Sequence, residues 1–142
     1  MGPFAGTVTS VDVEEMLRSA QTIAVVGLSS DPGRDSNSVA RYLQEVGYRI
    51  IPVNPYEDQV LGERSFPSLA DLPEGPDIVD VFRRAEHTPS VAQQAVAIGA
   101  KVLWLQSGIV SDESRRIAEE GGLAYVENAC IRTEHQILRG PR

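Results

Sequence analysis

Residues 22–36, TIAVVGLSSDPGRDS, join a run of apolar residues to a loop of mostly small residues. The run Thr22–Gly27 lacks polar alternation, which is typical of a strand buried on both faces. The loop ends at Asp35 and Ser36, either of which can cap a following helix. The apolar positions after it have helical spacing, at Val39, Tyr42, Leu43 and Val46. The stretch therefore predicts a strand, a tight turn and an amphipathic helix, the opening unit of an α/β protein.

A glycine at the junction of a helix and a strand recurs three times, at Gly47, Gly99 and Gly121. Glycine suits this place because it has no Cβ to clash in the left-handed conformation that often ends a helix. Apolar runs predict strands at residues 22–27, 49–53, 77–82, 101–105 and 123–126. The expected fold class is α/β, a single Rossmann-like, doubly wound domain with a mainly parallel five-stranded sheet.

Further signals place the helices between these strands. Thr88 followed by Pro89 is typical of an N-cap and a first helical residue, and Ser111 is a second candidate N-cap. A first helix is expected over about residues 9–20. The proline-rich connection between the second and third strands favours one short helical turn near residues 68–72 over a full crossover helix.

Length and composition suit one domain. With 142 residues, 42% of them hydrophobic, the chain can bury a core but is short for two domains. We expect residues 1–142 to form this domain, with residues 1–9 as a flexible tail. The single cysteine, Cys130, allows no internal disulfide and favours a cytoplasmic location.

Charge and hydropathy argue against two classes of partner. The net charge of −7 disfavours nucleic acid and anionic membrane surfaces. The longest apolar runs, residues 23–26 and 102–105, are far shorter than the roughly 20 residues of a spanning helix. The opening MGPFAG lacks the basic and apolar regions of a signal peptide, so we expect none.

Ligands of open α/β sheets bind beyond the carboxyl ends of the strands, so the residues after each strand are the candidate site. The loop over residues 27–36 offers small residues, backbone amides and a helix N-terminus, which favour an anion. Arg34, Arg83 and Arg84 collect at the same edge of an otherwise acidic chain. Guanidinium groups bind phosphate well, so we expect a ligand with several phosphates.

Two common nucleotide motifs are missing. No Gly-Lys-Ser/Thr occurs, which argues against a P-loop. The dinucleotide fingerprint would need glycine at Ser29 and Pro32, and Asn54 stands where the ribose-binding acid is expected. An ordinary NAD dehydrogenase is therefore disfavoured. Two alternatives stay open: NAD(P) or another nucleotide binds in the same cleft, or Gly27 serves only as a tight turn between strand and helix.

The motifs IAVVGLS (23–29), GYRIIPVNP (47–55), DVFR (80–83) and WLQSG (104–108) occur in order, followed by Cys130, Glu134 and His135. This series closely resembles the small stand-alone CoA-binding proteins of bacteria, the YccU-like family. Their fold is similar to the CoA-binding N-terminal domain in the α subunit of succinyl-CoA synthetase. The resemblance runs from about Val13 to Leu138. One departure is Arg34-Asp35-Ser36, where the family commonly carries Arg-Pro-Ser.

The resemblance implies that coenzyme A lies across the carboxyl edge of the sheet. Its phosphates would lie at the first loop and its nucleotide end near the second strand, while the residues after the third and fourth strands would line the path of the diphosphate and pantetheine. The residues implied are Gly27, Leu28, Ser29, Ser30, Arg34, Ser36, Asn54, Pro55, Phe82, Arg83, Gln106, Ser107 and Gly108. The function implied is non-catalytic binding of CoA or acyl-CoA, as a carrier or sensor.

Reaction chemistry is not indicated beside this binding site. His87 and His135 are each expected to be solvated or hydrogen-bonded, and no metal-ligand spacing occurs. An enzyme acting on an acyl-CoA thioester stays as an alternative, with His87 as the best candidate base.

Two interpretations of Cys130 stay open. It lies at the ligand edge, where a mixed disulfide with the CoA thiol is chemically feasible. Alternatively it is a small buried apolar residue. Two protein partners also stay open, a second copy in a homodimer and a CoA-using enzyme.

Overall fold

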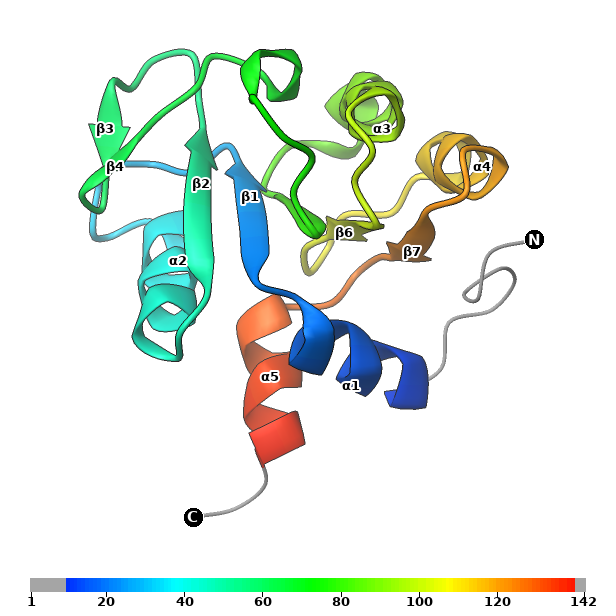
Figure 1. The fold of residues 1–142 in the computed structure, drawn as a ribbon, viewed down its shortest axis with the longest axis horizontal. Helices are drawn as coiled ribbons and strands as arrows, with labels where there is room; N and C mark the ends of the chain where they lie inside the picture. Colours follow the sequence, from blue (N-terminus) through cyan, green and yellow to red (C-terminus); the bar gives the residue numbers. More distant parts are fainter. Residues whose placement is uncertain (1–9, 140–142) are drawn as a thin grey trace.

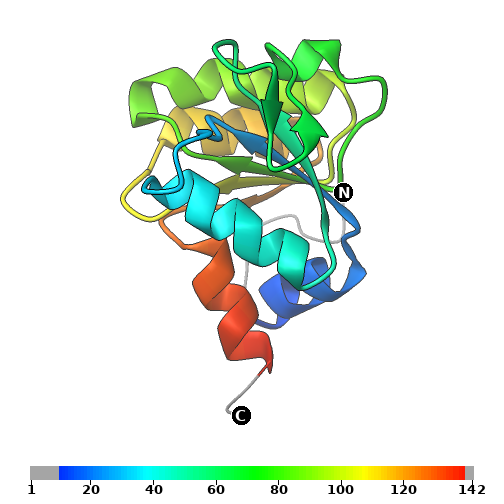
Figure 2. The same ribbon diagram turned by 90° about the vertical axis from the view of Figure 1, so that its left-hand side faces the viewer.

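The computed structural model describes residues 10–139 and shows one parallel sheet between two layers of helices (Figures 1 and 2). The sheet order is β2-β1-β5-β6-β7, and every neighbouring pair is parallel. This confirms the predicted five-stranded Rossmann-like fold. The tail predicted for residues 1–9 lies outside the described residues. The strands of the sheet are β1 (Thr22–Val26), β2 (Arg49–Val53), β5 (Ile78–Val81), β6 (Val102–Leu105) and β7 (Ala124–Val126).

Strand side chains alternate between two apolar cores, which explains the continuous apolar runs. On β1, Ile23 and Val25 face one core, while Ala24 and Val26 face the other. Figure 2 shows the helices on the two sides of the sheet. The first core is covered by α1 (Ser10–Ser19), α2 (Asp35–Glu45) and α5 (Ile131–Arg139), and the second by α3 (Thr88–Ala97) and α4 (Asp112–Glu120).

The connection from β2 to β5 holds more structure than the sequence analysis predicted. The short helical turn is confirmed as η1 (Leu69–Asp71). A small hairpin of β3 (Gln59–Val60) and β4 (Glu63–Arg64) precedes it and was not predicted. Its two turn residues, 61 and 62, both have positive φ, at 53° and 79°. Leucine is an uncommon first residue in such a turn, so the usual Asn-Gly or Asp-Gly signal is absent.

The cap predicted for α2 was wrong. Its N-cap is Arg34, which makes no side-chain capping bond. Asp35 is already the first helical residue. The hydroxyl of Ser36 instead accepts a hydrogen bond from the Ser29 amide at 3.0 Å, which holds the preceding loop against the helix.

Of the two caps predicted for α3 and α4, one was wrong and one is confirmed. The turn η2 (Ala85–His87) runs directly into α3, so His87 is the N-cap and the prediction of Thr88 was wrong by one residue. The Thr88 hydroxyl donates back to the carbonyl of Ala85 at 2.7 Å. The prediction for α4 is confirmed, because the Ser111 hydroxyl accepts the Ser114 amide at 3.1 Å.

The chain changes direction in the sheet between β1 and β5, which places a crevice at their carboxyl ends. Gly27 ends β1 there with a φ of +87°. A Cβ on it would lie 2.5 Å from the carbonyl oxygen of Phe82, so only glycine allows the two strand ends this approach. None of the helices between residues 10 and 139 has the length and apolar character needed to cross a membrane.

Candidate functional site

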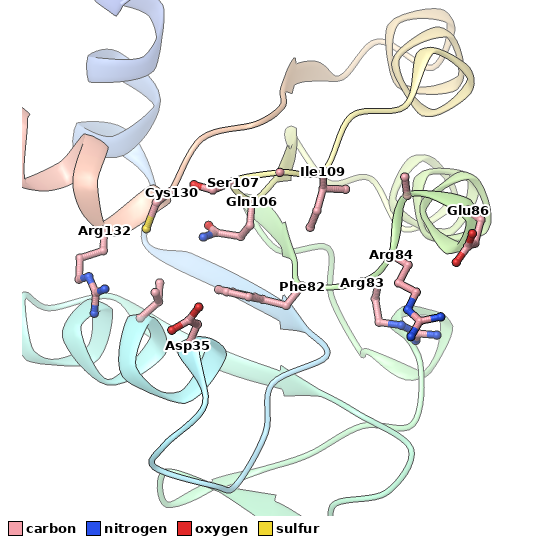
Figure 3. A pocket seen from close by; sticks show the side chains of 13 residues that line it. Asp35, Phe82, Arg83, Arg84, Glu86, Gln106, Ser107, Ile109, Cys130 and Arg132 are labelled. Atoms are coloured by element: carbon pink, nitrogen blue, oxygen red, sulfur yellow. The ribbon is translucent and has the colours of Figure 1, made fainter.

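A cavity of about 690 Å³ opens at the carboxyl edge of the sheet (Figure 3). This volume lies within the range of roughly 300–1,000 Å³ that is usual for small-molecule sites. The cavity lies beyond the ends of β5 and β6 and reaches the first turns of α2 and α5. Its lining comprises Asp35, Val39, Phe82, Arg83, Arg84, Ala85, Glu86, Gln106, Ser107, Gly108, Ile109, Cys130 and Arg132.

Five of the implied site residues meet around this cavity because β5 and β6 are parallel neighbours that end side by side. Phe82 and Arg83 follow β5, and residues 106–108 follow β6. Gly108 turns the chain with a φ of +84°. Its amide donates to Oδ1 of Asn128 at 2.8 Å, which links this loop to the one after β7. These residues lie together because they follow the carboxyl ends of neighbouring strands, where ligands of open α/β sheets bind.

Charge is unevenly distributed around the cavity. Arg83 and Arg84 are exposed and lie together at one end, while Cys130 and Arg132 lie at the other (Figure 3). Arg34 is exposed at the start of α2, next to the lining residue Asp35. Within residues 10–139, the guanidinium groups of Arg34, Arg83 and Arg84 have no hydrogen bond or ion pair. Unpaired guanidinium groups on a concave surface favour an anionic ligand.

The loop after β1 lies beside the cavity rather than in its lining. Leu28 is fully buried in the first core, so only its backbone faces the loop. The Ser30 amide donates to Oε2 of Glu57 at 2.8 Å. The Ser30 side chain and then this amide hydrogen bond lower the pKa of Glu57, so the group is ionised at neutral pH. The carboxylate of Glu57 therefore accepts the hydrogen bond of a loop amide that the resemblance assigns to phosphate binding.

Asn54 connects two loops instead of presenting its amide to a ligand. Its Nδ2 donates to the carbonyl of Leu28 at 2.9 Å, and its Oδ1 accepts the amide of Tyr56 at 2.9 Å. Pro55 beside it is exposed. The implied residues outside the lining are thus Gly27, Leu28, Ser29, Ser30, Arg34, Ser36, Asn54 and Pro55.

Several lining residues escaped the sequence analysis because they belong to helices. Val39 lies on α2, and Arg132 lies in the first turn of α5, a helix that was not predicted. Nη1 of Arg132 donates to the Ser38 hydroxyl at 2.8 Å, which joins the two helices beside the cavity. The position of Cys130 after the last strand could have indicated Arg132, because the residues that follow Cys130 begin at the same edge of the sheet.

Neither histidine lines the cavity. His87 is exposed, with Nε2 4.0 Å from Oε1 of Glu86. His135 lies within the helical layer, where its Nδ1 and the Tyr42 hydroxyl are 2.7 Å apart. Its ring makes edge contacts with Tyr42 and Tyr48. Burial, and then the charge of Arg139, lower the pKa of His135, so it is neutral at physiological pH.

Comparison with known proteins decides the family. A family model described as "CoA binding domain" matches residues 21–136. The chain belongs to this family. This CoA binding domain is 39% identical over 132 residues to the uncharacterized protein YneT of Bacillus subtilis, covering 92% of this chain and 97% of YneT. A solved structure of a hypothetical protein from Pyrococcus horikoshii OT3 superposes with a TM-score of 0.90 at 41% identity, covering 94% of each chain.

Larger relatives contain a similar region. The domain is 29% identical over 101 residues to the ADP-forming acetate–CoA ligase II of Archaeoglobus fulgidus. That match covers 70% of this chain but only 15% of the ligase. The domain is thus similar to one part of a much longer enzyme.

Proposed function

We propose that this protein binds CoA or acyl-CoA in the cavity at the carboxyl edge of the sheet, without catalysing a reaction. Its role would be that of a carrier or sensor, or of a partner that delivers CoA to a CoA-using enzyme. The observation that carries the proposal is the pair of unpaired guanidinium groups of Arg83 and Arg84 at one end of this cavity, with the exposed guanidinium group of Arg34 next to the lining residue Asp35.

The shape and chemistry of the cavity support a ligand with a charged and a less polar end. The arginines at one end suit phosphates. Between the two ends, Phe82 and Ile109 provide apolar surface, while the Ser107 hydroxyl and the Gln106 amide provide polar groups. A pantetheine chain, with two amides and a thiol, needs such a mixed surface.

Family membership gives the proposal independent support. The ligase of Archaeoglobus fulgidus is named for a reaction that uses CoA. The family match over residues 21–136 includes every loop that borders the cavity. We therefore assign CoA, rather than NAD(P) or a mononucleotide, as the ligand of this chain. The position of His87 outside the lining supports a binding role over hydrolysis of an acyl-CoA thioester.

A thermal-shift comparison of CoA, dephospho-CoA, NAD and ATP tests the ligand. A ligand that binds only the folded state stabilises it by about 2.7 kcal/mol at 100 times its Kd, so CoA should raise the melting temperature most. The Arg83→Gln/Arg84→Gln variant should lose most of this shift, while Arg116→Gln, an exposed arginine of α4, should keep it. A CoA shift that is absent, or no larger than the shift with NAD or ATP, would refute the proposal.

The non-catalytic part needs its own test. Incubation with acetyl-CoA, followed by thiol detection, should release thiol no faster than a control without protein. Release well above that control, and lost in His87→Ala, would instead establish a thioesterase.

A further inference from the structure

Cys130 lies directly before α5 and contributes its thiol to the cavity. The side chain is half-buried rather than sealed in the core. Figure 3 shows its sulfur beside the side-chain amide of Gln106, at the end of the cavity away from Arg83 and Arg84. A ligand whose phosphates lie at the arginines can therefore bring its opposite end to this sulfur.

The surroundings of Cys130 stabilise a thiolate. Burial by itself raises the pKa of the thiol, but hydrogen bonds from the Thr133 amide, the Gln106 side chain, the Thr133 hydroxyl and the Arg132 amide outweigh it. The net effect is a pKa below the ordinary thiol value. Oε1 of Gln106 accepts the Ile131 amide at 3.1 Å, which fixes the side chain so that its donor end faces the sulfur. Lowered thiol pKa values at helix N-termini are typical of reactive cysteines.

A second, independent feature lies on the same face of the sheet. Asp80 of β5 is fully buried, two residues before Phe82, and neither oxygen of its carboxyl group has a hydrogen-bond partner in the described structure. Burial raises its pKa well above the ordinary value, and the charge of Cys130 adds to the rise. A buried polar group without a partner destabilises a fold, so its presence here calls for a functional reason. The raised pKa of Asp80 reflects its burial first and then its electrostatic interaction with Cys130.

We propose that Cys130 is a thiol-exchange site that takes the sulfur of CoA into a mixed disulfide. The inference rests on the proposed binding of CoA in this cavity. The exchange adds a reversible covalent step to the proposed binding of CoA. It also makes the symmetrical disulfide of CoA, its oxidised form, a second ligand of the cavity.

The step is balanced as a thiol–disulfide exchange. The Cys130 thiolate attacks one sulfur of the CoA disulfide, and a bond forms between Sγ and that sulfur while the original S–S bond breaks. The leaving CoA thiolate takes the electron pair and is protonated by water. One disulfide is consumed and one is formed, so no further oxidant is needed. Attack by a free thiol on the mixed disulfide reverses the step.

Intact-mass spectrometry of the full chain, after incubation with CoA disulfide in the absence of reductant, measures the adduct. We expect one CoA, less two hydrogens, on the wild type and none on Cys130→Ser. Because bound ligand has a high effective concentration, the adduct should form at least about tenfold faster with CoA disulfide than with glutathione disulfide. Adenosine 3′,5′-bisphosphate should slow only the reaction with CoA disulfide.

Two variants separate recognition from reactivity. Arg83→Gln/Arg84→Gln should slow the reaction with CoA disulfide alone. Gln106→Glu keeps an acceptor for the Ile131 amide but removes the donor to sulfur, so it should slow both disulfides by about tenfold. Arg116→Gln should change neither rate.

Reversible binding of CoA to Cys130→Ser, measured by calorimetry, distinguishes the two proposals. If CoA binds but the wild type forms no adduct, or reacts equally fast with glutathione disulfide, the exchange site is refuted and CoA binding stands. If neither wild type nor Cys130→Ser binds CoA, both proposals are refuted.

Discussion

One aspartate precedes β5 and another lies near its carboxyl end, and the two carboxyl groups have opposite surroundings. Asp77, at the amino edge of the sheet, accepts the amides of Gln21 and Thr22 on Oδ2 at 2.8 and 3.1 Å. Its Oδ1 lies 3.2 Å from Nζ of Lys101. Asp80, three residues later, is fully buried and its carboxyl oxygens have no partner within the described chain. The amino edge thus uses its charge to hold strands together, whereas the carboxyl edge leaves polar groups unsatisfied.

The same contrast extends to the cations of the two edges. Lys101 pairs with Asp77, while Arg34, Arg83 and Arg84 have no partner among residues 10–139. Unpaired groups give little stability but are free to bind a ligand. We therefore expect substitution of Asp77 at the amino edge to change stability alone, and substitution of the unpaired arginines at the carboxyl edge to change binding.

The largest effect should come from Asp77→Ala. It leaves the Gln21 and Thr22 amides without their acceptor and frees Lys101, which should lower the free energy of unfolding by about 3 kcal/mol. Urea denaturation measures this loss. Calorimetry should show an affinity for CoA within about twofold of wild type, since bonds at this edge do not reach the cavity. If Asp77→Ala lowered the binding free energy for CoA as much as the free energy of unfolding, the two edges would not have separate roles.

The Arg83→Gln/Arg84→Gln variant makes the converse prediction. Removing two charges from the proposed phosphate end of the cavity should weaken CoA binding by about 10- to 100-fold, measured by calorimetry at low salt. Its urea denaturation curve should match that of wild type, because neither side chain has a partner to lose within residues 10–139. Arg116→Gln is the matched control for loss of surface charge. Equal weakening by this control would show a general charge effect rather than a site.

Asp80→Asn should stabilise the protein at pH 7 by about 1–2 kcal/mol. Asparagine has nearly the same shape but cannot ionise, so the variant removes only the pH-dependent cost of burying an acid. The raised pKa of Asp80 means that its contribution is complete below the unfolded-state value of about 3.9 and is lost as the pH rises. The gain from Asp80→Asn should therefore vanish near pH 4.

Asp77→Asn is the control with the opposite sign. Burial alone would raise the pKa of Asp77, but the Gln21 and Thr22 amides and Lys101 lower it overall. The contribution of Asp77 is present above the unfolded-state pKa and is lost as the pH falls through the lower folded-state value. The loss caused by Asp77→Asn should thus shrink on acidification. Parallel pH dependence in the two variants would contradict the assignment of opposite surroundings.

The sequence predicted what depends on local pattern. The apolar run of residues 22–26 marks a strand, and Gly47 and Gly99, both with positive φ, mark helix ends. After α4 the positive φ falls on Gly122, one residue after the predicted Gly121. The rule for strand ends then brought Phe82, Arg83 and Gln106 to one edge. Contacts between distant segments could not be predicted in this way. The hydrogen bond from Ser30 to Glu57 and the interaction of Asp80 with Cys130 depend on how the elements pack.

The smallest predicted effect concerns Glu57 at the carboxyl edge, whose carboxylate accepts a backbone amide as that of Asp77 does. Glu57 accepts the Ser30 amide, as Asp77 accepts the amides of Gln21 and Thr22. Asp77 joins strands, whereas Glu57 lies in a loop that a phosphate would approach. If Glu57 occupies the place of a ligand oxygen, its charge competes with CoA.

Glu57→Gln should therefore raise the affinity for CoA by about two- to fivefold in calorimetry, because a neutral amide gives up the Ser30 amide more easily than a carboxylate does. The gain should diminish at high salt, since the competing charge is exposed. Glu63→Gln, a substitution in the β3–β4 hairpin, is the matched control for lost negative charge and should have no such effect. If Glu57→Gln instead leaves affinity unchanged and lowers the melting temperature, Glu57 is a structural acceptor like Asp77, and the two edges differ less than their arginines and lysine suggest.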